Sequence, residues 1–215
     1  MTLNRYYAAI MLFFTVDATA FAGGPIDYLL FYNVTRKTVF EAERLDGEVK
    51  AARAELKIRQ DFMAMAKKLL KVNAISQEEY EWRGLDLTVA EHELEQQQEL
   101  VALTHTMTEI NEERSRHAAG SNIDLRAFFD LNVRRWNHEC RLFEIEAEKE
   151  HSIYRVEHKI HQRWLNLRGE NSIAQSDLMM RENKAQDALV RMRAAQKNII
   201  ECQNHRPTWE EISSI

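Results

Sequence analysis

Residues 69–95 read LLKVNAISQEEYEWRGLDLTVAEHELE, and this stretch decides the fold. Ser76 begins the run Ser-Gln-Glu-Glu, in which the Ser hydroxyl can accept from the Glu79 N–H and the Glu79 carboxylate can return to the Ser76 N–H. This capping box predicts a helix start at Ser76. The preceding helix should end near Val72, which leaves about three connecting residues, Asn73 among them. A link this short forces two long helices into an antiparallel hairpin.

The helix before this turn has the spacing of a coiled-coil seam, in which apolar residues alternate at steps of three and four. One member of the seam is polar, and the nine positions are Ala42, Leu45, Val49, Ala52, Leu56, Arg59, Met63, Ala66 and Leu70. The whole chain contains only six Gly and two Pro, so few helix breakers favour long helices. We therefore predict an all-α protein.

Two further breaks divide the rest of the helical pattern. The run 118–122 ends the second helix, and Ser121 or Asn122 is expected to cap a third helix that continues to about residue 168. Gly169 opens the next turn, after which Ser172 and Gln175 can form a capping box for a fourth helix. A last short helix capped at Thr208 follows Pro207. The third and fourth helices thus form a second hairpin.

The two hairpins align with each other when the sequence is shifted by 98 residues. The shift places Leu69 on Leu167, and it superposes both turns and both caps. Heptad helices align in some register by chance, but chance does not explain the coinciding turns and caps. We therefore predict an internal duplication of about 98 residues, with two antiparallel coiled-coil hairpins side by side and both tips at the same end.

Apolar residues outside the seams form a second stripe on each hairpin. Ile58 and Phe62 lie in the first hairpin, and Val156 and Ile160 are their equivalents in the second. These stripes predict either association of copies of the chain or packing of one hairpin on the other.

The predicted domain organisation begins with a secretory signal over residues 1–22, which carries Arg5, an apolar run over residues 8–16 and the small-residue pattern Ala20-Phe21-Ala22. The alternative is an apolar N-terminal helix that packs on the bundle. A short segment over 23–34 follows, then hairpin 1 over 35–118, hairpin 2 over 121–205 and a tail over 206–215. We expect a periplasmic mature chain without a bilayer span. The net charge of −5 disfavours nucleic acid as a partner.

The two cysteines are expected to form a disulfide. Cys140 and Cys202 lie in the seams of the third and fourth helices, equally far from the turn at residues 169–172. Residues equidistant from an antiparallel turn face each other, and an exported protein meets oxidising conditions. The alternative is a pair of buried thiols, because free Cys packs as a small hydrophobic residue.

The sequence carries no motif for catalysis, so we expect neither an enzyme nor a cofactor. Phosphate-binding Gly loops, Cys-x-x-Cys pairs and nucleophile elbows do not occur. Glu148 and His151 have the spacing of half a di-iron site, but the second Glu-x-x-His that such a site needs does not occur. His151, His158 and His161 share a helix face, which fits solvated positions better than a metal site.

The turn residues resemble the α-hairpin of periplasmic adaptor proteins, the membrane fusion proteins of efflux pumps and type I secretion systems. In that family the tip carries an Arg, a Leu four residues later and a Ser seven residues after the Leu. The first hairpin matches at Leu69 and Ser76 but has Met65 at the Arg position. The second matches at Arg163 and Leu167 but has Ala174 at the Ser position.

The resemblance covers the hairpins, because the chain lacks room for the lipoyl and β-barrel domains of the adaptors. It is more distant to the hairpins of TolC-like outer-membrane ducts. It implies that Leu69, Ser76, Arg163 and Leu167 contact partner helices, for example those of a TolC-like duct or an inner-membrane transporter. In the alternative interpretation, Leu69 and Leu167 close the seams and Ser76 only caps. The competing functions are a periplasmic holdase chaperone, a structural spacer or, without a signal, a cytoplasmic coiled coil.

Overall fold

The computed structural model describes residues 25–168 and 174–213, with side chains from residue 40 onward. All elements in these ranges are helices: α2 (Pro25–Lys71), α3 (Gln77–Ala118), α4 (Leu125–Arg168), α5 (Gln175–Asn204) and α6 (Trp209–Ser213). The all-α prediction is confirmed, and none of the described residues forms a strand.

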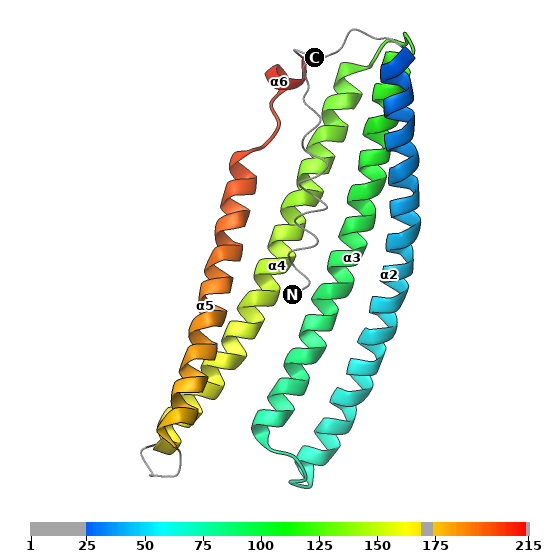
Figure 1. Ribbon diagram of the computed structural model, residues 1–215. Helices are drawn as coiled ribbons and strands as arrows, with labels where there is room; N and C mark the ends of the chain where they lie inside the picture. The colour runs from blue at the N-terminus through cyan, green and yellow to red at the C-terminus, as the bar shows by residue number, and fades with distance from the viewer. Residues whose placement is uncertain (1–24, 169–173, 214–215) are drawn as a thin grey trace.

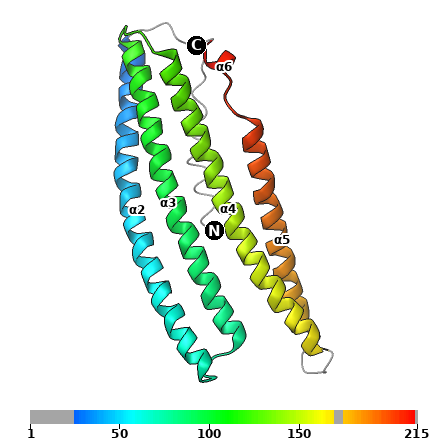
Figure 2. The ribbon, with the colours of Figure 1, turned by 180° about the vertical axis from the view of Figure 1, so that it is seen from behind.

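The four long helices lie in a single row. Helix α2 packs on α3, α3 on α4 and α4 on α5, and these are the only pairs of long helices whose described backbones meet. Figures 1 and 2 show this order from both sides. The C-terminal ends of α2 and α4 lie at the same end of the molecule, which is the tip end of both hairpins. The two antiparallel hairpins and their common tip end are therefore confirmed, whereas the internal duplication remains a prediction. The inner helices α3 and α4 pack on two sides, and the outer helices α2 and α5 pack on one.

Helices α2 and α3 of hairpin 1 both end in the same backbone motif. The N–H of Ala74 bonds to the Leu69 carbonyl at 2.9 Å, and Asn73 adopts a positive φ of 56°. At the opposite end Gly120 has a φ of 90°, and the Ser121 N–H bonds to the Arg116 carbonyl at 3.0 Å. Both are Schellman motifs, in which an αL residue turns the chain out of the helix, and Asn and Gly are the residues that tolerate αL best.

The helix starts agree with the sequence at two positions. Ser76 Oγ accepts from the Glu79 N–H at 3.0 Å, as predicted. The last helix, α6, has a complete capping box, because Thr208 and Glu211 each accept from the other's backbone N–H, at 3.4 and 2.9 Å.

Two other helix starts are corrected. Asp124 rather than Ser121 or Asn122 caps α4, since its carboxylate accepts from two N–H groups at 2.9 and 3.2 Å. A carboxylate also interacts favourably with the positive end of a helix. Helix α5 begins at Gln175 after Ala174, which has no side-chain acceptor. The predicted cap Ser172 lies outside the described residues.

The first helix begins at Pro25, ten residues before the start expected for hairpin 1 at residue 35. Pro suits the first turn of a helix because its missing N–H would have no partner there, and the apolar segment that follows continues helically. The predicted signal over residues 1–22 lies outside the described residues. Among the described helices, none combines the length and apolar character needed to cross a membrane.

A hydrophobic cluster closes the end opposite the tips. Ile110 from α3, Phe128 from α4 and Ile212 from α6 are buried together there. The rings of Phe129 and Trp209 meet edge to face, with centroids 5.4 Å apart. The predicted tail thus folds back as α6 and packs on α4.

A disulfide links α4 and α5, and the predicted pair Cys140–Cys202 is confirmed with the two Cα atoms 5.6 Å apart. Trp136, one turn before Cys140, donates its indole N–H to the Cys202 carbonyl at 2.9 Å. The Cys202 carbonyl therefore accepts two hydrogen bonds, from the Trp136 indole and from the His205 N–H at the end of α5.

Candidate functional site: the hairpin tips

The tip of hairpin 1 contains an apolar hollow between α2 and α3. Its volume is about 190 Å³, and its lining residues are Phe62, Met65, Ala66, Leu69, Ile75, Glu79 and Arg83. Met65 and Phe62 remain 52% and 40% exposed, so the hollow opens to solvent through apolar side chains. A guanidinium nitrogen of Arg83 lies 3.6 Å from a carboxylate oxygen of Glu79. The Cζ atom of the same guanidinium lies 6.0 Å from the centroid of the Phe62 ring. The tip therefore combines an apolar floor with a charged rim.

The predicted tip residues of hairpin 1 occupy different roles. Leu69 is half-buried in the hollow, while Ser76 is exposed and caps α3. Asn73 supplies the αL position of the turn, and Glu79 lies at the rim of the hollow. Beside them, Val72 is 70% exposed in the turn that follows α2.

The tip of hairpin 2 differs from that of hairpin 1. Leu167 is 42% exposed at the end of α4, with Leu165 at 39%. Gln175 is exposed at the start of α5. Arg163, in contrast, points to the other hairpin and pairs with Glu81 of α3. Contact of Arg163 with a partner stays a prediction, and within the described chain its guanidinium is paired with Glu81.

This pair belongs to an inter-hairpin cluster close to the tips. Glu81 also accepts from Lys159 at 2.8 Å. Glu78 of α3 accepts from the Trp164 indole N–H at 3.0 Å and pairs with Arg181 of α5. The Arg181 guanidinium lies over the Trp164 ring at 4.9 Å, a cation–π contact.

The inter-hairpin cluster lies where the two hairpins diverge toward their tips (Figures 1 and 2). The ribbons of α3 and α4 move apart there in both views. Lys159 and Arg163 of α4 nevertheless reach Glu81 of α3. The cluster thus holds the two tips at a set separation.

Glu81 is the electrostatic centre of the cluster. Its side chain is 11% exposed, and this burial by itself raises the pKa. Hydrogen bonds from Arg163, Lys159 and Gln77, together with the Arg163 charge, overcome burial and lower the pKa of Glu81 to about 2. The carboxylate is therefore ionised throughout the physiological range.

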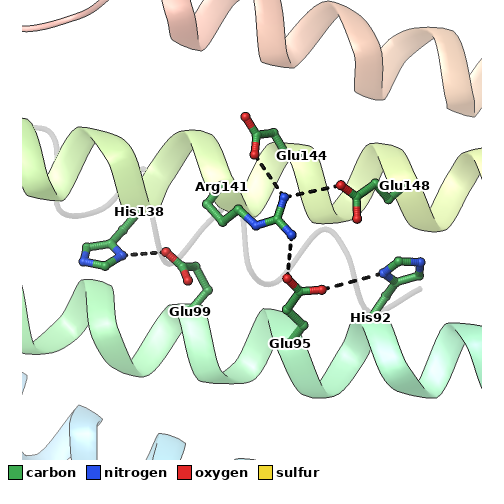
Figure 3. A network of polar contacts seen from close by, with 7 residues as sticks. All are labelled: His92, Glu95, Glu99, His138, Arg141, Glu144 and Glu148. Carbon is green, nitrogen blue, oxygen red and sulfur yellow. Dashed lines mark hydrogen bonds and ion pairs between the residues drawn. The ribbon is translucent and has the colours of Figure 1, made fainter.

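A second polar network joins α3 and α4 at mid-height (Figure 3). Arg141 donates to Glu95 at 2.6 Å, to Glu144 at 3.0 Å and to Glu148 at 3.3 Å. The bonds to Glu95 and Glu144 raise the pKa of Arg141, so it stays charged. In the same network, Glu99 Oε1 and His138 Nδ1 lie 2.5 Å apart.

This network includes a set of potential metal ligands. The ligand atoms of His92, Glu95 and Glu148 lie within 4.8 Å of one another. The Arg141 guanidinium already binds both carboxylates and supplies the positive charge that a metal would bring (Figure 3). The arrangement therefore acts as an ion-pair clamp between hairpins.

Sequence reasoning missed the inter-hairpin cluster and the polar network, because their members come from helices whose facing sides a heptad pattern does not specify. One signal was available: Glu78, Glu81, Lys159 and Arg163 are opposite charges near the ends of two adjacent elements. The second apolar stripes of the two hairpins, equivalent in the sequence alignment, also differ in burial. Ile160 is fully buried on the inner helix α4, whereas its equivalent Phe62 on the outer helix α2 is 40% exposed.

No family model, curated protein or solved structure matches this chain.

Proposed function

We propose that this chain is a non-enzymatic helical-hairpin protein that binds helices of envelope proteins through its tips. It would serve as an adaptor-like or accessory component of an export or efflux assembly. The apolar hollow at the tip of hairpin 1 is the observation that carries this proposal. A partner helix could place an apolar side chain in the hollow, and Arg83 at its rim could bind carbonyls at the end of that helix.

Two further features support tip binding. The turn between α2 and α3 is rigid, because a Schellman motif ends one helix and Ser76 caps the next. Leu165 and Leu167 give the second tip an exposed apolar surface of its own. A partner could therefore bind both tips together.

We propose that the protein acts in the periplasm. The disulfide is compatible with an oxidising compartment. The mass of the mature chain tests this point. A mature N-terminus at Gly23 is the expected result, and an intact Met1 would contradict export.

Site-specific photo-cross-linking in the native envelope tests the function. A photoreactive residue replaces Val72 at tip 1 and, in a second variant, Leu167 at tip 2, while Val190 on the outer face of α5 serves as the control with 64% exposure. We expect both tips to link to one transport component of the inner or outer membrane, and the control to link to none. Absence of any link from both tips would contradict tip binding.

A charged substitution at the mouth of the hollow tests whether the partner binds there. Met65→Glu places a carboxylate at its mouth and should abolish the link from Val72, because burying an unpaired charge is unfavourable. Val190→Glu is the matched control on another exposed helix face. An unchanged link in Met65→Glu would show that the partner does not enter the hollow.

A holdase chaperone is the second candidate. It is favoured by the exposed apolar side chains along α2, Ile58, Phe62 and Met65. Links to many unrelated proteins, with equal yield from Val72 and Val190, would support this function over the first.

A further inference from the structure

We propose that the tip end of the molecule binds the surface of an anionic lipid bilayer, with basic side chains on the phosphate headgroups and exposed apolar side chains inserted between them. The inference goes beyond the proposed function, because none of the residues that carry it lines the hollow of hairpin 1. It is also tested separately, since binding to lipid vesicles is measured without any protein partner.

Exposed apolar side chains outside the hollow are concentrated at both tips. Val72 lies in the turn that follows α2, and the others lie in the last four residues of α4 or the first six of α5. At 1.5 Å per residue, all of them are within about 10 Å of a helix end, which is the depth that interfacial side chains reach in a bilayer. The complete set is Val72, Leu165, Leu167, Met179 and Met180.

These side chains point in different directions around the tip of hairpin 2. At about 100° per residue, Leu165 and Leu167 lie about 200° apart around α4, on opposite sides of the helix. Met179 and Met180 lie about 100° apart around α5 on the same scale. A single helix packed beside the tip would cover one side and leave the other in water. A bilayer surrounds what enters it, so it covers all of these side chains together.

Basic side chains accompany the apolar ones at the ends of α2 and α4. Four of them are exposed, and they are Lys67, Lys68, Lys71 and Arg168. None of the four forms an ion pair with another described residue. Basic residues next to exposed apolar ones are the combination that binds anionic lipid surfaces, because the charges meet phosphate groups while the apolar groups leave water.

The acidic side chains of this end are used largely within the molecule. Glu78 and Glu81 belong to the inter-hairpin cluster, and Glu79 pairs with Arg83. Asp177 and Glu182 of α5 stand outside these pairs. The described tip end therefore presents a surplus of basic charge to the surroundings.

The net charge of the whole chain gives this surplus an orienting effect. The chain carries −5, so an anionic surface repels most of the molecule and attracts its basic end. Both tips lie at the same end of the molecule, so one flat surface can contact both (Figures 1 and 2). The molecule would then stand on the membrane by its tips.

Co-sedimentation of the purified full chain with vesicles tests the proposal. Vesicles of phosphatidylcholine with about 30 mol% phosphatidylglycerol are compared with vesicles of phosphatidylcholine alone. We expect at least about tenfold tighter binding to the anionic vesicles, and weaker binding when the salt is raised from about 0.1 M to 0.5 M. Equal binding to both vesicles, or binding to neither, overturns the proposal.

A triple variant tests whether the basic side chains of the tip make the contact. Lys67→Gln combined with Lys68→Gln and Lys71→Gln should raise the dissociation constant about a hundredfold, since each basic residue near an anionic surface favours binding about fivefold. Circular dichroism verifies that the variant remains helical. An unchanged affinity would place the membrane contact elsewhere in the chain and overturn the proposal.

The matched control removes the same charge from exposed positions of the same helix, farther from the tip. It combines Lys50→Gln, Arg53→Gln and Lys57→Gln. The nearest of these lies 14 residues, about 21 Å, from Lys71, which is about two Debye lengths at physiological salt. We therefore expect less than about a threefold loss. An equal loss in both triple variants would show that net charge decides binding, and would overturn the assignment to the tips.

An environment-sensitive fluorophore tests the orientation on the membrane. Both native cysteines are in the disulfide, so a single introduced Cys can carry the label. Labels on Val72→Cys and, in a second variant, on Leu167→Cys should shift their emission to the blue when anionic vesicles are added, because they enter an apolar layer. Val190→Cys is the control, 15 residues or about 22 Å from the start of α5, and should not shift. An equal shift at Val190 would mean that the helices lie flat on the membrane. That result, or no shift at either tip, overturns the proposal.

Discussion

Reduction of the Cys140–Cys202 disulfide should release helix α5 while hairpin 1 stays folded. The disulfide connects residues 62 apart in the sequence. In the chain-entropy model, 2.1 + 1.5R ln 62 gives about 14 cal/mol/K, or about 4 kcal/mol at 25 °C.

The attachment of α5 explains why the loss should be local. The buried apolar side chains of α5 are Leu178, Ala185, Ala188 and Ala195. Among the described helices, α4 is the one whose backbone α5 meets, and Arg181 adds one ion pair to α3. Burial of three Ala methyl groups and one Leu stabilises by roughly 5 kcal/mol, before the entropy of ordering the helix is subtracted. The disulfide therefore contributes about as much as all of this apolar contact.

Hydrogen exchange measured by mass spectrometry is the assay. After reduction, protection of the amides in residues 185–204 should fall by up to about three orders of magnitude, since each factor of ten corresponds to about 1.4 kcal/mol. Peptides covering residues 85–103 of α3 serve as the internal control and should keep their protection. A double variant, Cys140→Ser with Cys202→Ser, should reproduce the effect without reductant. If α5 exchanges equally in the oxidised and reduced protein, the reasoning is refuted.

Three other predictions concern individual side chains, each measured by urea unfolding of dilute protein. Glu81→Gln should lower the free energy of unfolding by about 3 kcal/mol at pH 7, because the pKa of Glu81 is lowered to about 2 from 4.5. This stabilisation is complete above pH 4.5 and is lost as the pH falls toward 2; a pH-independent difference would contradict it. Asp124→Ala should lower the free energy of unfolding by about 1 kcal/mol, and Ser121→Ala should leave it nearly unchanged. A larger loss for Ser121→Ala than for Asp124→Ala would indicate that Ser121 caps α4, as expected from the sequence. Ile160→Ala, at a fully buried position, should cost about 3 kcal/mol, against less than about 1 for Ile58→Ala, and similar losses would mean that α2 is covered in the monomer.

The sequence could predict what is local or regular along one helix. Ser76 and its neighbours specify the first turn, because capping and the Schellman motif depend on residues within one turn of each other. The cysteine pair also follows from regularity, since an antiparallel hairpin places positions equidistant from its turn at one height. Helix α2 starts at Pro25, inside the expected short segment over residues 23–34, because the pattern of so short an apolar segment does not distinguish a helix from a strand.

The sequence could not predict how the hairpins meet. A heptad seam determines which face of a helix packs within its own hairpin, but several ion pairs that join α3 and α4 lie outside the seams. Arg163 illustrates this limit: its spacing resembles an adaptor tip, yet its charge serves the contact with Glu81. Likewise Ile160 and Phe62 are equivalent in the repeat, and only the row order of the helices makes one inner and the other outer.

The inter-hairpin cluster has a consequence for the thermodynamics of the proposed tip binding. Once one tip is bound, a second tip held at a set separation meets its own site at a high effective concentration, typically millimolar for short connections. Two contacts that are weak alone then combine into tight attachment, but only where the partner presents two sites at the matching distance. Glu81, Arg163 and Arg181 would therefore set the distance between the tips. They would select partners by the spacing of their binding sites without contacting them.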